Sequence, residues 1–216
     1  MNKAEYKLLS GKAKILHSLF CQYPEPEFIE QFRHQEIIDL WPSYNKSSSA
    51  GVQLIMRALY NETRSDKESI ELKLDYTRLF IGVGEPVCPP WGSIYLSPSQ
   101  LVNDESTLEL VNFYRSIGVN IEVGNNEPID HIGLMMLVLS YLFEELASDK
   151  SNGEHFGSCI VFFRHHFCPW VGCFLKELEQ HADTDFYKGL SLLAQSYVSE
   201  VKQLLGVIPE ERKLYR

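Results

Sequence analysis

An aspartate and a histidine, Asp130 and His131, are adjacent in the sequence, and a histidine oriented by a carboxylate can act as a general base. Cys88 or Ser93 could then be the nucleophile of a hydrolase. Neighbouring residues on a helix point about 100° apart, however, so this pair is poorly placed for a mutual hydrogen bond. The pattern favours a structural interpretation, in which Asp130 caps first-turn amides or pairs with a neighbouring helix and His131 packs in a groove. We predict no catalytic residue and keep the hydrolase as an alternative.

A second group of side chains carries atoms that could bind a metal ion: His155, His165, His166, Cys168 and Cys173. Their spacing matches no standard zinc pattern. The following Pro169-Trp170 indicates a helix junction with bulky packing instead. We therefore predict no metal site.

Two glycine-containing segments partly match phosphate-binding loops. Gly11-Lys12 looks like the end of a P-loop, but Tyr6 occupies the first glycine position and Ala13 the hydroxyl position that would hold magnesium. Gly82-Val83-Gly84 has Val87 where a third glycine is needed. Neither segment predicts a nucleotide site, and the sequence predicts no cofactor.

The loop Pro89-Pro90-Trp91-Gly92-Ser93 is the clearest candidate for binding. Its prolines restrict the backbone, so Trp91 can offer a large apolar surface at low entropic cost. The alternative is that Trp91 fills the core beneath the loop. Together with the segment Glu127-Pro128-Ile129-Asp130-His131, this loop is predicted to form the lips of a peptide-binding groove.

The elements that must position these residues are helical. Apolar residues recur with helical periodicity almost everywhere, and no stretch sustains the alternation of a half-buried strand. We predict an all-α fold, a bundle of about ten helices forming a single domain over residues 1–216.

Several helix boundaries follow from local signals. A helix is expected from Pro26 towards Trp41, and residues 42–51 are expected to form a surface loop. The run Ser97-Pro98-Ser99-Gln100 predicts a helix start, and Gly118 a helix end. No regular element is expected over residues 81–97. Glu127-Pro128 is expected to open the most apolar and central helix, and the last helix is expected to run from about Asp185 to Gly206.

Composition restricts the partners and the compartment. The chain has 216 residues, a formal net charge of −9 and scattered basic residues, which disfavours nucleic acid and favours a cationic partner. The N-terminus lacks a secretory signal pattern, and the apolar run 132–143 is far shorter than the roughly 20 residues of a membrane span. The five cysteines are odd in number and form no CxxC pair, which indicates reduced thiols. We expect a cytoplasmic protein without membrane insertion.

The sequence resembles the TorD/DmsD family of redox-enzyme maturation chaperones. The likeness spans nearly the whole chain and is carried by Tyr76-Thr77-Arg78-Leu79-Phe80, Gly82, the loop 89–93, Asn126-Glu127-Pro128 and Asp130-His131. It implies an all-helical chaperone that binds the twin-arginine signal peptide of a molybdoenzyme catalytic subunit, such as a DMSO reductase, until the client's cofactor is loaded. The implied peptide-binding residues are Tyr76, Leu79, Phe80, Pro89, Pro90, Trp91, Ser93, Asp130 and His131.

Two positions depart from the family pattern. Gly84 stands where DmsD-like proteins tend to have an aromatic residue, and Tyr76 where they often have tryptophan, so client choice is expected to differ. The resemblance leaves open whether the chaperone docks on the Tat translocase, which would place it at the periphery of the inner membrane. A guanine-nucleotide-binding regulator of the same pathway is the second functional hypothesis, and the Cys/Ser hydrolase the third.

Overall fold

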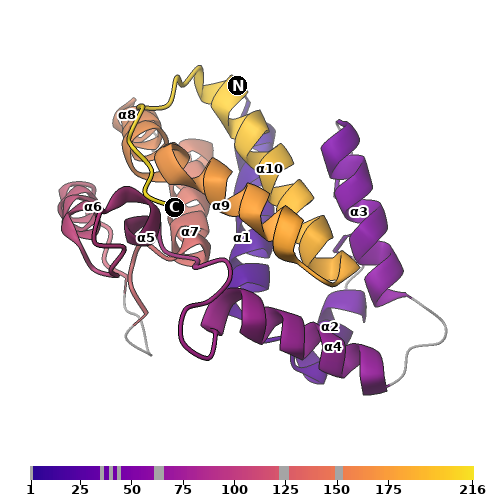
Figure 1. The fold of residues 1–216 in the computed structure, drawn as a ribbon. Coiled ribbons are helices and arrows are strands. Elements are labelled where there is room, and N and C mark those ends of the chain that lie inside the picture. The colour runs from indigo at the N-terminus through magenta and orange to yellow at the C-terminus, as the bar shows by residue number, and fades with distance from the viewer. Residues whose placement is uncertain are drawn as a thin grey trace. The chain divides into compact units, whose positions relative to one another are not determined.

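The structure, a computed structural model, describes residues 2–34, 37–38, 41–42, 45–60, 66–121, 127–148 and 153–216. In these ranges the chain forms ten α-helices and two π-helical turns (Figure 1). The only β-type pairing in the same ranges is an isolated bridge between Trp91 and His131. The prediction of an all-α bundle with about ten helices is confirmed.

The chain groups into two compact units. Unit 1 consists of Met1–Cys21, Pro90–Gly172 and Ser199–Arg216, and unit 2 of Gln22–Pro89 and Cys173–Val198. The helices α9 (Cys168–His181) and α10 (Asp185–Leu205) contribute residues to both units. The expectation of a single domain over residues 1–216 stays a prediction.

Unit 1 is built around α7, which packs against α1. As the periodicity predicts, α7 is largely enclosed, with most of its residues buried on more than one face. The hydroxyl groups of Ser10 on α1 and Ser140 on α7 form a buried hydrogen bond of 3.0 Å between the two helices. Besides its parts of α9 and α10, unit 1 contains α1 (Lys3–Cys21), α5 (Gly92–Leu96), α6 (Glu105–Ser116), α7 (Ile132–Ala147), α8 (Glu154–Val161) and the π-helical turn η2 (Phe162–Phe167).

Unit 2 has an aromatic core around Tyr187 of α10. The rings of Tyr76 and Phe80 lie 6.0 and 5.6 Å from its ring, and Phe174 and Tyr23 extend the cluster. Two of these four pairs, Phe80–Tyr187 and Tyr23–Tyr76, meet edge to face, a geometry that adds to the stabilisation from burial. Besides its parts of α9 and α10, unit 2 contains α2 (Pro26–His34), α3 (Lys46–Leu59), α4 (Asp66–Tyr76) and the π-helical turn η1 (Thr77–Ile81).

Two helix starts differ from the predicted ones because another side chain provides the cap. The run 97–100 is not a helix start: the hydroxyl groups of Ser97 and Ser99 donate to Asp104, and Asp104 accepts from the N–H of Glu105, where α6 begins. Likewise α7 begins at Ile132 rather than at Pro128, because His131 is the residue that caps it.

Three further segments differ from the predicted ones. The helix α2 ends at His34 and a turn follows at residues 37–38, so the helix expected towards Trp41 is shorter. The helix α3 already begins at Lys46, because Asn45 and Ser48 form a capping box within the expected loop. A short helix, α5, occupies Gly92–Leu96, where no regular element was expected.

Two glycines end helices as predicted. Gly118 and Gly206 have φ angles of 70° and 62°, a left-handed conformation that costs glycine little. After α6, the N–H of Gly118 bonds the carbonyl of Arg115 and the N–H of Val119 that of Tyr114, which is the Schellman pattern.

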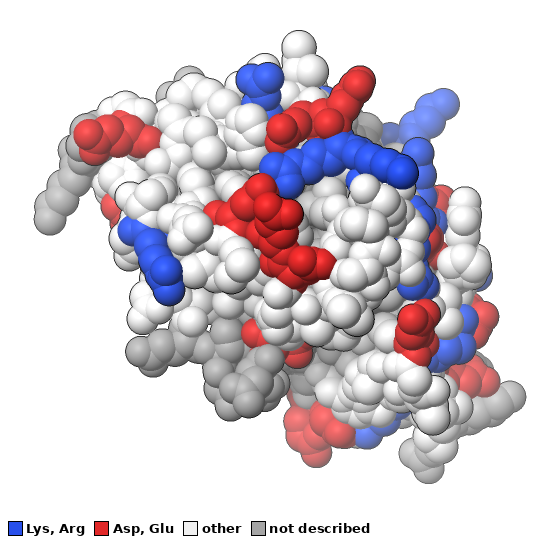
Figure 2. Space-filling view, turned by 60° about the vertical axis from the view of Figure 1, so that its left-hand side comes forward, with Lys and Arg blue, Asp and Glu red and all other residues white. Residues whose placement is uncertain are grey.

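The surface carries charges of both signs close together. Figure 2 shows a face on which Asp and Glu side chains gather beside Lys and Arg, with broad uncharged areas around them. Within the described ranges, no helix combines the length and the hydropathy needed to cross a membrane.

Candidate functional site

The predicted peptide-binding residues fall in both units. Tyr76, Leu79, Phe80 and Pro89 belong to unit 2, whereas Pro90, Trp91, Ser93, Asp130 and His131 belong to unit 1. The chain passes from one unit to the other within the Pro89-Pro90 pair. Asn126, which contributes to the family resemblance, lies outside the described residues.

In unit 1 the tryptophan loop and the start of α7 are joined by backbone hydrogen bonds. The N–H of Ile132 donates to the carbonyl of Pro90 at 2.8 Å, and that of Gly92 to the carbonyl of Asp130 at 3.2 Å. The Trp91 and His131 rings meet edge to face, with their centroids 6.3 Å apart. These two segments, distant in sequence, thus form one local structure.

Trp91 is held in place but only half-buried. Its indole N–H donates to the Glu127 carboxylate at 2.6 Å. Beneath the loop, a Cβ on Gly92 would lie 2.7 Å from the indole nitrogen of Trp170, so only glycine lets the backbone approach Trp170 this closely. The loop therefore offers part of a fixed indole next to a carboxylate.

Asp130 acts as a cap, but for α5 rather than for its own helix. Its Oδ2 atom accepts from the N–H of Ser93 at 2.7 Å and from the hydroxyl of Thr107 at 3.2 Å. Asp130 is 4% exposed, so these bonds replace water at the Oδ2 atom of a buried carboxylate, whereas its Oδ1 atom has no hydrogen-bond partner among the described residues. A structural role for Asp130 is confirmed: of the two predicted possibilities, it pairs with neighbouring helices and does not cap the first turn of its own helix.

His131, the residue that caps α7, is neutral in the folded protein. Its Nδ1 atom accepts from the N–H of Gly133 at 3.1 Å and lies 3.8 Å from the Cys21 sulfur. Burial and the neighbouring His17 lower the pKa of His131 to about 3. Burial and the charge of Glu127 raise the pKa of the Cys21 thiol to about 12, which makes this thiol a poor nucleophile at neutral pH.

Acidification is expected to destabilise the protein through His131. The unfolded chain takes up a proton as the pH falls below about 6.5, whereas the folded chain resists protonation until about pH 3. The contribution of His131 to the free energy of unfolding is therefore fully present above pH 6.5 and decreases as the pH falls. At pH 5 the free energy of unfolding should be lower by about 2 kcal/mol. Urea unfolding at a series of pH values measures this loss.

His131→Asn is the matched control for this prediction. Asparagine is a good N-cap but does not titrate, so the variant should lose less stability between pH 7 and pH 5 than the wild type. His166, whose pKa burial lowers to about 4, acts in the same direction in both proteins. Equal pH slopes for the two proteins would assign the acid sensitivity to groups other than His131.

The arrangement lacks the geometry of a hydrolytic triad. The carboxylate of Asp130 bonds Ser93 and Thr107, and the Nδ1 of His131 bonds a backbone N–H. A triad needs the carboxylate on the histidine and the histidine on the nucleophile. The hydrolase alternative is not favoured.

The other chemical candidates have structural partners. His165 bonds Glu210 at 3.1 Å, and the ring of His166 packs on that of Phe113. Lys12, in the P-loop-like segment, lies inside α1, and its buried side chain forms an ion pair of 2.6 Å with the partly exposed Glu200. No group of three or more possible metal ligands occurs in the part of the chain that the structure describes.

In unit 2 the predicted residues flank a π-helical turn. Leu79 and Phe80 lie in η1, and the N–H of Gly82 bonds the carbonyl of Thr77, five residues earlier. Such turns occur frequently at functional sites. Tyr76, Leu79 and Phe80 are each less than a tenth exposed, so in this conformation they form the core on which η1 rests.

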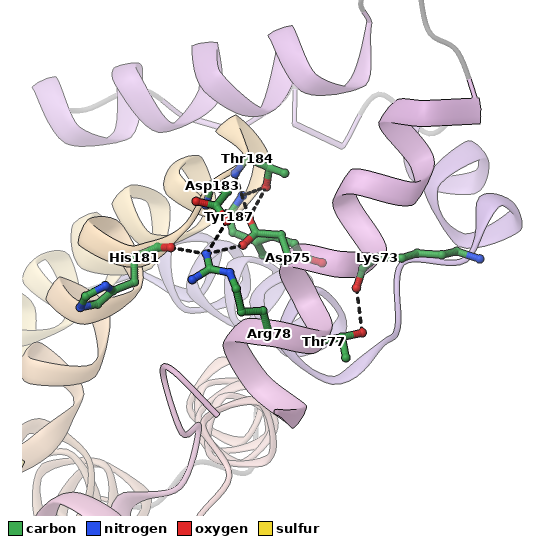
Figure 3. Close-up of polar contacts among 8 residues, drawn as sticks. All are labelled: Lys73, Asp75, Thr77, Arg78, His181, Asp183, Thr184 and Tyr187. Carbon is green, nitrogen blue, oxygen red and sulfur yellow. Dashed lines mark hydrogen bonds and ion pairs between the residues drawn. The ribbon is translucent and has the colours of Figure 1, made fainter. Parts of the chain in front are cut away.

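One residue of this region has no counterpart in the sequence predictions. Asp75 is buried, and its Oδ2 atom accepts from the N–H groups of Asp183 and Thr184 and from the Thr184 hydroxyl at 2.8 to 3.0 Å (Figure 3). Its Oδ1 atom accepts from Arg78 at 2.9 Å. Asp75 thereby fixes the start of α10 to α4. In the sequence, this role is indicated only by the position of the carboxylate next to the aromatic motif. Its backbone partners are more than 100 residues away, so no local pattern predicts them.

Comparison with known proteins agrees with the resemblance seen in the sequence. Residues 45–176 match the family model described as nitrate reductase delta subunit. The probable Tat proofreading chaperone DmsD of Haemophilus influenzae is 38% identical over 118 residues, which cover 55% of this chain and 54% of that protein.

Two further relatives match over most of their length. The Tat proofreading chaperone DmsD of Salmonella typhimurium is 28% identical over 204 residues, 94% of each chain. The chaperone protein TorD of Vibrio vulnificus is 24% identical over 197 residues, which cover 88% of this chain and 92% of that protein.

Proposed function

Since the chain belongs to the nitrate reductase delta subunit family, which includes the TorD/DmsD chaperones, we propose that it is a chaperone for molybdoenzyme maturation that binds the twin-arginine signal peptide of its client. Its role is binding rather than catalysis. It acts in the cytoplasm, before the client is exported. Docking on the Tat translocase stays a prediction.

The fixed, half-buried indole of Trp91 is the observation that supports this proposal most. Bonds from both neighbours, Pro90 and Gly92, to the start of α7 hold the loop in one conformation. A preorganised aromatic side chain loses little entropy on binding. The Glu127 carboxylate beside it adds a negative charge. An apolar surface next to a carboxylate suits a peptide that combines apolar and cationic residues.

Six of the other predicted site residues are buried, and each supports a segment of its own unit. Ser93, Asp130 and His131 are each at most 6% exposed and hold the Trp91 loop. Tyr76, Leu79 and Phe80 do the same for η1. We assign these six residues a positioning role and propose that Trp91 contacts the leader peptide directly.

The affinity expected from such a surface is moderate. Burying a few side chains of leucine size contributes about 1.5 to 3 kcal/mol each. After the ordering of a flexible peptide is subtracted, roughly 8 kcal/mol would remain, which corresponds to a micromolar dissociation constant. That affinity suits a chaperone that must release its client.

Trp91→Ala is expected to weaken leader binding by at least about 30-fold, as for a central aromatic anchor. The partly exposed indole should contribute less to folding than to binding. Calorimetric titration with a twin-arginine leader peptide, and with a scrambled peptide of the same charge, measures the effect.

Tyr141→Ala is the matched control, because Tyr141 is an exposed aromatic residue of α7 in the same unit. Its removal should leave leader affinity unchanged. Unchanged leader affinity in Trp91→Ala would contradict the anchor role, and equal wild-type affinity for the leader and the scrambled peptide would contradict the proposed function.

A further inference from the structure

A cleft of about 690 Å³ opens within unit 2. Residues from the end of α3, from α4, from η1 and from the segment 183–186 that leads into α10 line it, so we call it the α4–α10 cleft. Its size falls in the range of roughly 300 to 1,000 Å³ that is typical of ligand sites. Figure 3 shows one wall, where Asp75 and Arg78 face Asp183 and Thr184.

The cleft carries an excess of negative charge. Four carboxylates and two guanidinium groups line it, namely those of Glu71, Asp75, Asp183, Asp185, Arg57 and Arg78. Asp75 is buried and is satisfied by the start of α10. Asp183, with 76% of its side chain exposed, and Asp185, with 34%, face solvent. A cation is therefore the better electrostatic match for this cleft.

Both exposed carboxylates are paired with an arginine of the cleft. Arg57 bonds Asp185 through two nitrogens, at 2.5 and 2.6 Å, although 66% of its side chain is exposed. Arg78 lies 2.9 Å from Asp183. Exposed ion pairs contribute little to stability, because solvent screens them. A guanidinium group from a ligand can adopt the same two-nitrogen geometry and take the place of Arg57.

An exposed apolar strip lies beside the charges. Leu74 lines the cleft and is 63% exposed, and Ile70, one helical turn earlier on α4, is 55% exposed. Residues four apart lie on the same face of a helix. A ligand of the cleft would thus meet carboxylates and apolar side chains next to each other.

We propose that the α4–α10 cleft receives the arginine pair of the leader peptide, with Asp183 and Asp185 as its partners and Leu74 and Ile70 beneath the adjoining apolar residues. This inference rests on the proposed function and adds to it. Asp130 is 4% exposed and its Oδ2 atom caps α5, so the arginine contact is assigned to carboxylates that solvent reaches.

The test uses two leader peptides, one with its arginine pair and one with glutamine in both positions. The double variant Asp183→Asn/Asp185→Asn should bind the arginine peptide about tenfold more weakly than the wild type does, and the glutamine peptide equally well. Such non-additivity is the signature of a direct contact. Both substitutions keep the backbone N–H groups that bond Asp75.

A variant with the opposite expected sign strengthens the test. Arg57→Gln removes the side chain that competes with the peptide for Asp185. The arginine peptide should therefore bind several-fold more tightly. A loss of structure would weaken binding and cannot produce this gain. The charge-matched control is Glu30→Gln/Glu179→Gln, which neutralises two exposed carboxylates of unit 2 outside the cleft and should change affinity for the two peptides equally.

The outcomes separate the two proposals. If the wild type binds the arginine peptide but the cleft variants affect both peptides equally or not at all, the cleft assignment is overturned and leader binding stands. If the wild type binds neither peptide, the proposed function fails and the cleft assignment fails with it.

Discussion

Asp75→Ala is expected to lower the free energy of unfolding by roughly 3 to 5 kcal/mol. Asp75 is 3% exposed, and its side chain accepts four hydrogen bonds, from Arg78, Asp183 and twice from Thr184. Removing the carboxylate leaves two backbone N–H groups at the start of α10 without their acceptor, and leaves the Arg78 guanidinium without its buried partner. Each orphaned group costs about 1 to 3 kcal/mol.

Urea unfolding followed by circular dichroism measures this loss. Asp75→Asn keeps the shape and one acceptor oxygen, so it should fall between the wild type and the alanine variant. Asp183→Asn, which changes an exposed carboxylate of the same network, should remain within about 0.5 kcal/mol of the wild type. A comparably small change in Asp75→Ala would show that water replaces the carboxylate at the start of α10.

The helical class was predictable because apolar periodicity reports burial directly. It identified α7 as the central helix, since its apolar residues cover more than one face. The helix ends at Gly118 and Gly206 were predictable for a different reason: the left-handed conformation there favours glycine. Signals of both kinds are local and act whatever the rest of the chain does.

Helix starts were less predictable, because several side chains compete to cap one helix. Ser97 and Asp104 are both residue types that can serve as an N-cap. Asp104 caps α6, and the hydroxyl groups of Ser97 and Ser99 donate to its carboxylate instead of capping a helix of their own. The same bonds hold the pKa of Asp104 below its usual range. Similarly, Asp130 caps α5, a helix from another segment, which no local pattern indicates.

The candidate site was predictable in part. The Trp91 loop and the Asp130-His131 segment were expected to act together, and within unit 1 they are joined by backbone bonds. The α4–α10 cleft was not foreseen, because its lining comes from residues 57–58, 71–78 and 183–186. The packing of α4 and α10 around Tyr187 brings these segments together, and long-range packing of this kind leaves no spacing pattern in the sequence.

Gly133→Ala is expected to lower the free energy of unfolding by roughly 2 to 4 kcal/mol. A Cβ at this position would lie 2.2 Å from the Cys21 sulfur and 3.2 Å from the His131 ring. Gly133 cannot shift freely, because its N–H bonds His131 and its carbonyl bonds His17 at 2.8 Å. The extra methyl group must therefore separate α1 from α7 or break the cap of α7. Thermal and urea unfolding measure the loss.

A second glycine and a second-site change show whether that clash is the cause. Gly157→Ala, at an open position within α8, meets no atom within 4 Å, so it should raise stability by about 0.5 to 1 kcal/mol. Cys21→Ala removes the sulfur that the new methyl group would strike, so the double variant Gly133→Ala/Cys21→Ala should recover much of the loss. Residues in direct contact show such coupling, whereas distant ones simply add. If the two losses added instead, the cost of Gly133→Ala would arise from the His131 cap, and the pH dependence of that variant would then differ from that of the wild type.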